Sequence, residues 1–230
     1  MYPFFSPVRT GLPYLPLTLQ VLSLILLILI GYGVHIWGQK TSFKLFWRIS
    51  MMVQLAVVYT WFVWASLPLS ELLPLYHCRM AMFILLFSPK GRFKDYFALI
   101  GVIGSILAML VPALYPHRLL HLTNVFFFTG HFGLFALSLM HLKTSDTVEE
   151  IDLVWLGRMT ISLNSFLLLV NLLTDGNYGF LADTPILHTK NVLLNLLLVS
   201  GVFMLLLTPT VALFQRSSYR SQLVTIDKKP

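Results

Sequence analysis

Charged residues are scarce in this sequence. Aspartate, glutamate, lysine and arginine together make up 11% of its 230 residues, whereas a soluble domain carries about 25%. Hydrophobic residues make up 57%, and the mean hydropathy is +0.80. This composition excludes a soluble globular protein and predicts a polytopic membrane protein. At about 20 residues for each membrane-spanning helix, the length leaves no room for a soluble domain.

The sequence contains a single cysteine, Cys78. One cysteine cannot form an internal disulfide, so its thiol is packed, reactive, or free to pair with another chain. Its neighbours are His77 and Arg79, in a segment otherwise apolar enough to lie in a membrane. Polar groups cost free energy in lipid, so this run needs either buried partners or a function.

Several catalytic motifs are missing as well. The sequence has no Walker loop and no Ser-x-x-Lys, Gly-x-Ser-x-Gly or His-Glu-x-x-His pattern. We interpret His117, His121 and His188 as residues of the membrane interface, because their spacing matches no specific metal motif. We therefore predict neither a metal nor a cofactor. The net charge of +7 comes from basic residues in short loops between apolar runs, which indicates topology rather than nucleic-acid binding.

The apolar runs predict an all-α fold, a polytopic membrane protein with seven transmembrane helices. The predicted spans cover residues 15–37, 46–67, 71–88, 96–114, 123–142, 154–173 and 192–214. Residues 15–214 then form one transmembrane domain. An extracellular segment, 1–14, precedes it, and a basic cytoplasmic tail, 215–230, follows it.

The basic residues predict the orientation. With seven spans, twelve lysine and arginine residues lie on one side of the membrane and three on the other, leaving aside Arg79 within the third span. Cytoplasmic loops carry the excess of such residues. We therefore expect the N-terminus outside and the C-terminus in the cytoplasm, in the plasma membrane of the cell. The twelve are Lys40, Lys44, Arg48, Lys90, Arg92, Lys94, Lys143, Arg158, Arg216, Arg220, Lys228 and Lys229; the three are Arg9, Arg118 and Lys190.

This orientation places several polar residues in the outer half of the bilayer. At 1.5 Å per residue, Cys78 lies about 10 Å below the outer surface and His131 about 12 Å below it. Asn171 falls in the last turn of the sixth span, and Asn177 and Tyr178 follow in the outer loop. Groups that share this depth predict a polar pocket open to the outer leaflet.

Four blocks of the sequence together carry a resemblance to a known family. The blocks are Leu73-Pro74-Leu75 followed by Cys78, Tyr96-Phe97 before Pro112, Phe127 to Gly133, and Val170 to Leu181 followed by Pro185. The last block, with Asn-Leu-Leu-Thr-x-Gly-Asn-Tyr-x-Phe-Leu, is the most specific. The four blocks resemble the YwaF family of small bacterial integral membrane proteins. That family groups with the eukaryotic transmembrane protein 164 family, whose members act as cysteine-dependent acyltransferases that move fatty acyl chains between phospholipids. One position departs from the pattern: the family has histidine two residues before the cysteine, where this chain has Tyr76 and carries His77 instead.

The resemblance implies an acyl transfer in which Cys78 is the nucleophile and His131 the base. Either His77 or Arg79 would hold thiolate or phosphate charge. Hydrogen bonds to the tetrahedral intermediate or to a lipid headgroup would come from the outer polar residues. Those residues are Asn171, Asn177 and Tyr178. The implied partners are membrane lipids.

Less specific interpretations remain open from the residues alone. Free cysteine is among the most buried residue types, so Cys78 also fits simple packing. His131 also fits a bond between helices, and Asn177 and Tyr178 fit a loop anchor. The alternative function is therefore a non-catalytic membrane protein, either a small-molecule carrier or a subunit that docks on another membrane protein. A metal-dependent enzyme built on the outer histidines lacks carboxylates at a convincing spacing.

Overall fold

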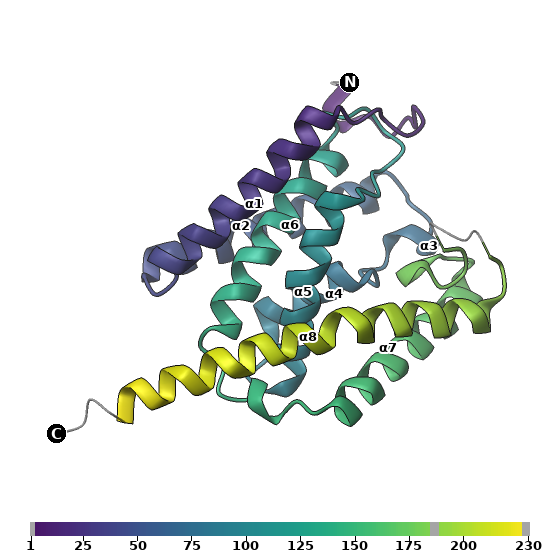
Figure 1. Ribbon diagram of the computed structural model, residues 1–230. Coiled ribbons are helices and arrows are strands. Elements are labelled where there is room, and N and C mark those ends of the chain that lie inside the picture. Colours follow the sequence, from purple (N-terminus) through teal and green to yellow (C-terminus); the bar gives the residue numbers. More distant parts are fainter. Residues whose placement is uncertain (1–2, 185–188, 227–230) are drawn as a thin grey trace. The chain divides into compact units, whose positions relative to one another are not determined.

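A computed structural model describes residues 3–184 and 189–226, with the side chains of 217–226 left aside (Figure 1). Pro185 and His188, which the sequence analysis noted, lie outside the described residues. The described part is all-helical and contains no strand, as predicted. Its α-helices are α1 (Leu17–Trp37), α2 (Thr41–Trp64), α3 (Leu69–Leu72), α4 (His77–Phe87), α5 (Arg92–Leu110), α6 (Leu122–Leu142), α7 (Leu153–Thr174) and α8 (Val192–Ile226), with 3-10 helices η1 (Pro3–Phe5), η2 (Val148–Glu150) and η3 (Tyr178–Phe180).

Six of these helices are long and apolar enough to cross a membrane, counted over the described residues. They are α1, α2, α5, α6, α7 and the Val192–Arg216 part of α8. The prediction of a multi-pass membrane protein is confirmed by these six spans. Each falls within a few residues of a predicted one, because length and apolarity alone decide which segments favour lipid.

The third predicted span, 71–88, is not one continuous helix. The short α3 ends at Leu72, Leu73 and Tyr76 have extended backbone, and α4 begins at His77. Pro74 explains the break, because its ring disfavours a helical conformation at Leu73, which has φ −69° and ψ 144°. With 11 residues, α4 is about 16 Å long, shorter than the hydrocarbon core of a bilayer.

The chain divides into two compact units. The first unit contains the chain up to Leu67 together with Gly101–Met140, and the second contains Pro68–Ile100 together with the chain from His141 onward. Helices α5 and α6 therefore contribute to both. Among the predicted site residues, His131 belongs to the first unit and all the others to the second.

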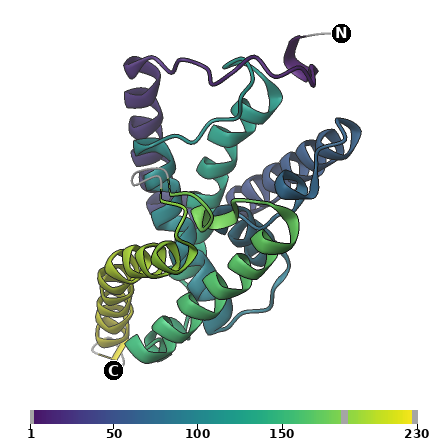
Figure 2. The same ribbon diagram turned by 90° about the vertical axis from the view of Figure 1, so that its right-hand side faces the viewer.

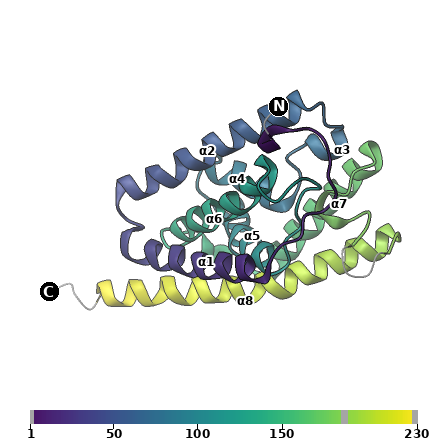
Figure 3. The ribbon, with the colours of Figure 1, turned by 90° about the horizontal axis from the view of Figure 1, so that it is seen from above.

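In the first unit, a three-residue connection joins α1 to α2 (Figure 3). The N-terminal residues 5–10 of this unit are bonded to the end of α2 and to the loop between α5 and α6. Three rings donate to backbone carbonyls of this segment. The bonds run from Trp61 Nε1 to Phe5 O (3.0 Å), from His121 Nε2 to Ser6 O (3.1 Å) and from His117 Nδ1 to Val8 O (3.2 Å).

The two histidines predict that this N-terminal attachment depends on pH. Their rings stack with centroids 4.2 Å apart. Burial, and then the charge of a protonated His117, lower the pKa of His121 from 6.5 to about 4, although the Ser6 carbonyl opposes the shift. A detached segment would let His121 bind a proton near pH 6.5. The attachment is therefore fully stable above about pH 6.5 and weakens as the pH falls toward 4.

Amide hydrogen exchange at Thr10, whose N–H donates to Pro116 O at 2.9 Å, measures this effect. We expect protection at pH 7.5 that declines below pH 6, after correction for intrinsic exchange rates. His121→Asn removes the titrating ring and should flatten the pH dependence. Protection of the wild-type segment that stays constant from pH 7.5 to 4.5 would contradict the prediction.

In the second unit, α7 and α8 pack together and are linked through η3 (Figures 1 and 2). Asp95 connects several segments at one end of this unit. It lies in the first turns of α5, and its side chain is fully buried. Its carboxylate accepts hydrogen bonds from His141 Nε2 at 2.7 Å, from Ser145 Oγ at 2.7 Å and from Thr147 Oγ1. Gln215 of α8 donates to carbonyls of the same connecting segment, 3.2 Å from Val148 O and 3.0 Å from Ile151 O. The α4–α5 turn, the end of α6 and the far part of α8 thus meet at one end of the unit.

Candidate functional site

The break between α3 and α4 lies opposite the middle of a membrane-spanning helix. His77, the first residue of α4, bonds Asn164, and Asn164 is the twelfth of the 22 residues of α7. Non-helical backbone at membrane depth is tolerated only where protein or a water-filled cavity satisfies its polar groups. The residues around the break therefore define the candidate site.

Tyr178 satisfies the backbone at the break. Its side chain is fully buried, and its hydroxyl donates to Leu69 O of α3 and accepts from the N–H of Leu73 at 3.0 Å. The ring of Tyr76 packs edge-on against the ring of Tyr178, with centroids 5.3 Å apart. One phenol thus replaces the helical bonds that Pro74 prevents.

Tyr178→Phe is expected to destabilise the protein by about 2 kcal/mol, because Leu73 N–H and Leu69 O lose a buried partner while the ring packing is kept. The measurement is thermal unfolding of the purified protein in detergent. Tyr32→Phe is the matched control, since Tyr32 is 63% exposed. Equal unfolding temperatures for the two variants would contradict this account of the break.

Asn171 and Asn177 hold Tyr178 and its loop in place. Asn171 Nδ2 donates to Tyr178 O at 2.9 Å, and Tyr178 N–H donates to Asn171 Oδ1 at 2.7 Å. Asn177 Oδ1 accepts from the N–H groups of Ala182 and Asp183, both at 3.0 Å, and its Nδ2 donates to Asp183 O at 2.8 Å. These bonds anchor the loop, and the substrate-binding role of both amides stays a prediction.

His77 belongs to a buried polar chain that crosses three helices. Its Nε2 lies 2.8 Å from Asn164 Oδ1, and Asn164 Nδ2 donates to Ser200 Oγ of α8 at 3.0 Å. With the amide nitrogen engaged by Ser200, the amide oxygen faces the imidazole, so the neutral ring carries its proton on Nε2. Nδ1 is left as an acceptor. Phe203 covers the ring at a centroid distance of 4.4 Å.

Gly179 lets the loop approach His77 closely. Its φ is +66°, and a Cβ atom at this position would lie 2.7 Å from His77 Cε1 and 3.1 Å from Leu167 Cδ1. The backbone of η3 therefore packs directly against the imidazole. Only glycine fits here without displacing the ring.

Cys78 and Arg79 follow His77 in the first turn of α4. Cys78 is half-buried, and Arg79 is 8% exposed. α4 begins without a side-chain cap on its first turn. The first N–H groups of a helix have no acceptor within it, and they make its start a favourable place for negative charge. The single thiol thus lies at the positive end of a helix that begins at membrane depth.

His131 is held within its own helix in the first unit. Its ring is buried, and Nδ1 donates to Phe127 O of the preceding turn at 2.6 Å. This bond fixes the proton of the neutral ring on Nδ1, so Nε2 keeps the lone pair that a general base requires.

A family model described as the TMEM164 family matches residues 4–215. The chain belongs to the TMEM164 family. No curated protein and no solved structure matches it. The TMEM164 assignment confirms the resemblance at family level and agrees with the six apolar helices in showing a multi-pass membrane protein; the narrower YwaF assignment stays a prediction.

In this TMEM164-family protein, sequence reasoning missed Asn164, Ser200 and Gly179 as site residues. Asn164 carried a signal, because an amide in the middle of an apolar span needs a partner. Ser200 carried no such signal in the sequence, since a serine in a membrane helix can bond the backbone of its own helix. Gly179 was readable as a turn residue, but its contact with His77 requires the folded chain.

Proposed function

We propose that this TMEM164-family protein is a membrane-embedded acyltransferase that moves fatty acyl chains between phospholipids through a thioester on Cys78. One observation carries the proposal: the single cysteine lies in the first turn of a helix that starts at membrane depth, next to a break stabilised by buried polar residues. The resemblance to cysteine-dependent acyltransferases supports the same assignment.

The start of α4 suits the charge that acyl transfer develops. Attack on an ester creates a negative oxygen, and backbone N–H groups at a helix start stabilise such an oxyanion. In a site away from water these dipoles act strongly and need no reorganisation. The interrupted helix thus provides backbone N–H donors at membrane depth. In a continuous helix, the same N–H groups would bond to carbonyl oxygens of the preceding turn.

The proposed reaction has two steps, acylation of Cys78 and transfer of the acyl group to an acceptor lipid. In the first, the Cys78 thiol gives its proton to the base, His131 Nε2, and the sulfur attacks the ester carbonyl carbon of a phospholipid. The carbon–oxygen ester bond breaks, and the leaving lysophospholipid oxygen takes the proton from His131. In the second, the hydroxyl of an acceptor lysophospholipid gives its proton to His131 and attacks the thioester. The carbon–sulfur bond breaks and the thiol is restored as it recovers that proton.

The remaining residues have supporting roles in this proposal. His77 and Arg79 hold negative charge of the thiolate or of a lipid phosphate, and Asn171, Asn177 and Tyr178 shape the binding site. The buried chain from His77 to Ser200 fixes the imidazole beside the break. The site opens to the outer leaflet of the plasma membrane, from which lipids enter laterally.

We further propose seven crossings, with α3, residues 73–76 and α4 together forming the third. The α4–α5 turn lies at the same end of the second unit as Gln215 of α8, and α4 begins beside the middle of α7. An interrupted crossing with its break midway fits both observations. Seven crossings also gather twelve basic residues on one side against three on the other, which supports an outer N-terminus and a cytoplasmic C-terminus.

A transfer assay tests the proposal. The purified full-length protein is given a phospholipid with an isotope-labelled acyl chain and an unlabelled lysophospholipid of a different headgroup. We expect the label to appear in the second lipid class. Cys78→Ala and His131→Ala should abolish transfer, and His35→Ala, which changes an exposed histidine of α1, should retain it. Folded wild-type protein without transfer would favour the non-catalytic alternative, a carrier or a subunit.

A further inference from the structure

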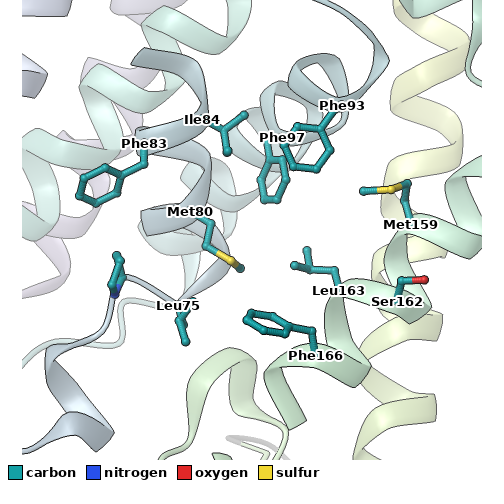
Figure 4. Close-up of a pocket in the computed structure, with 11 residues that line it drawn as sticks. Leu75, Met80, Phe83, Ile84, Phe93, Phe97, Met159, Ser162, Leu163 and Phe166 are labelled. Carbon is teal, nitrogen blue, oxygen red and sulfur yellow. The ribbon is translucent and has the colours of Figure 1, made fainter. Parts of the chain in front are cut away.

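The second unit contains an apolar groove between α4, α5 and α7. Its volume is about 410 Å³. Met80 of α4 and Met159 of α7 point into it from facing walls, with Phe93 at one end and Phe166 at the other (Figure 4). Ser162 supplies the one hydroxyl among the side chains that line it.

The dimensions of the groove select its occupant. A second helix, with a diameter of about 10–12 Å including side chains, needs far more room. Pockets of about 300–1,000 Å³ hold small ligands. Methionines on both walls adapt to a flexible apolar partner. In a membrane, the molecule that meets these conditions is a lipid hydrocarbon chain.

Two arginines lie at the Phe93 end of the groove. Arg92 directly precedes Phe93 on α5, and Arg158 directly precedes Met159 on α7. The Arg92 guanidinium carbon lies 5.6 Å from the centroid of the Trp155 ring, and Trp155 stands one helical turn before Arg158. Both arginines are exposed. Positive charge therefore lies beside the Phe93 end of the apolar groove. This is the end near the residues that we predict to be cytoplasmic.

The groove is separate from the cysteine. Along a helix, Cys78 and Met80 point about 200° apart. Met80 lines the groove, so Cys78 projects from the other face of α4. A chain in the groove is therefore not the chain that the thioester would carry.

We propose that this groove binds one anionic phospholipid of the cytoplasmic leaflet, with an acyl chain between α4, α5 and α7 and the net negatively charged headgroup at Arg92 and Arg158. That leaflet is rich in anionic lipids, and each basic residue near the surface attracts them. Glu150 pairs with Arg92 at 3.5 Å, and both side chains are about half exposed. Glu150 therefore competes with the lipid headgroup for the positive charge of Arg92. The proposal relies on the predicted orientation but not on acyl transfer.

Photolabelling of the full-length protein tests the proposal. Nanodiscs of phosphatidylcholine receive a trace of either phosphatidylserine or phosphatidylcholine that carries a diazirine in its acyl chain. Peptides that contain residues 80–84 and 159–166 are then quantified by mass spectrometry. Because each basic residue is worth about a fivefold preference, we expect the serine probe to label these peptides at least tenfold more than the choline probe.

Matched variants separate the headgroup from the chain. Arg158→Gln should lower labelling by the serine probe about fivefold, whereas Arg48→Gln, an exposed arginine of α2 in the first unit, should not. Ser162→Trp should block labelling by both probes, and Ser165→Trp, exposed and outside the groove lining, should leave it unchanged. Glu150→Gln should raise labelling by the serine probe.

Equal labelling by the two headgroups, or labelling that Arg158→Gln leaves intact, would overturn the proposal. Lipid transfer is measured on the same samples. Loss of labelling in Arg158→Gln with full transfer separates this site from the acyltransferase site. Labelling in wild-type protein without transfer supports the groove while rejecting the enzyme.

Discussion

Asp95→Ala is expected to destabilise the second unit by about 3–5 kcal/mol. The carboxylate is fully buried and accepts hydrogen bonds from His141, Ser145 and Thr147. Alanine removes the acceptor from all three donors at once, so an imidazole and two hydroxyls lose a buried, charged partner. The connection between α6 and α7 then loses its tie to α5.

Thermal or denaturant unfolding in detergent measures this effect. Asp95→Asn keeps one acceptor oxygen and should destabilise the protein less than Asp95→Ala does. Asp146→Ala is the control, because Asp146 lies on the same connecting segment but is exposed. If Asp95→Ala and Asp146→Ala unfold at the same temperature, the buried network does not stabilise the protein in the way described.

Gly179→Ala is expected to damage both the fold and the site. A left-handed conformation costs an L-residue about 1–2 kcal/mol, and the added Cβ would lie 2.7 Å from His77 Cε1. The imidazole must move, so the 2.8 Å contact between His77 and Asn164 lengthens or breaks. We therefore expect a loss of stability above 2 kcal/mol together with strongly reduced lipid transfer.

The control for this prediction is Gly201→Ala, since a Cβ at Gly201 meets no atom within 4 Å. Alanine at this helical position should be neutral or slightly stabilising. Nitrogen chemical shifts of a labelled His77 ring report the contact directly. An unchanged His77 spectrum in Gly179→Ala would show that the loop does not pack against the imidazole.

The long membrane spans were readable from the sequence because composition alone decides them. The predicted span 15–37 and the observed α1 differ by two residues, and 154–173 and α7 by one at each end. The span 71–88 was predicted as one helix because its residues are apolar. Pro74 was the local signal for a break, and its effect on Leu73 outweighs hydropathy.

The site was only partly predictable. Asn171 and Tyr178 are seven residues apart, and their hydrogen bonds arise from a local turn within the block from Val170 to Leu181. The contacts of His77 with Asn164, and of Asn164 with Ser200, join residues 87 and 36 positions apart. Such contacts depend on how each helix is rotated about its axis, and a span prediction carries no information on rotation.

Intact-protein and peptide mass spectrometry test the central claim most directly. The purified protein is incubated with a phospholipid whose acyl chain is isotope-labelled, and the reaction is quenched in acid. We predict an acyl adduct on the Cys78 peptide that hydroxylamine removes, that Cys78→Ala lacks and that His131→Ala reduces. A folded protein whose Cys78 stays unmodified with phospholipid donors would contradict the thioester mechanism and make this polar site one of recognition rather than chemistry.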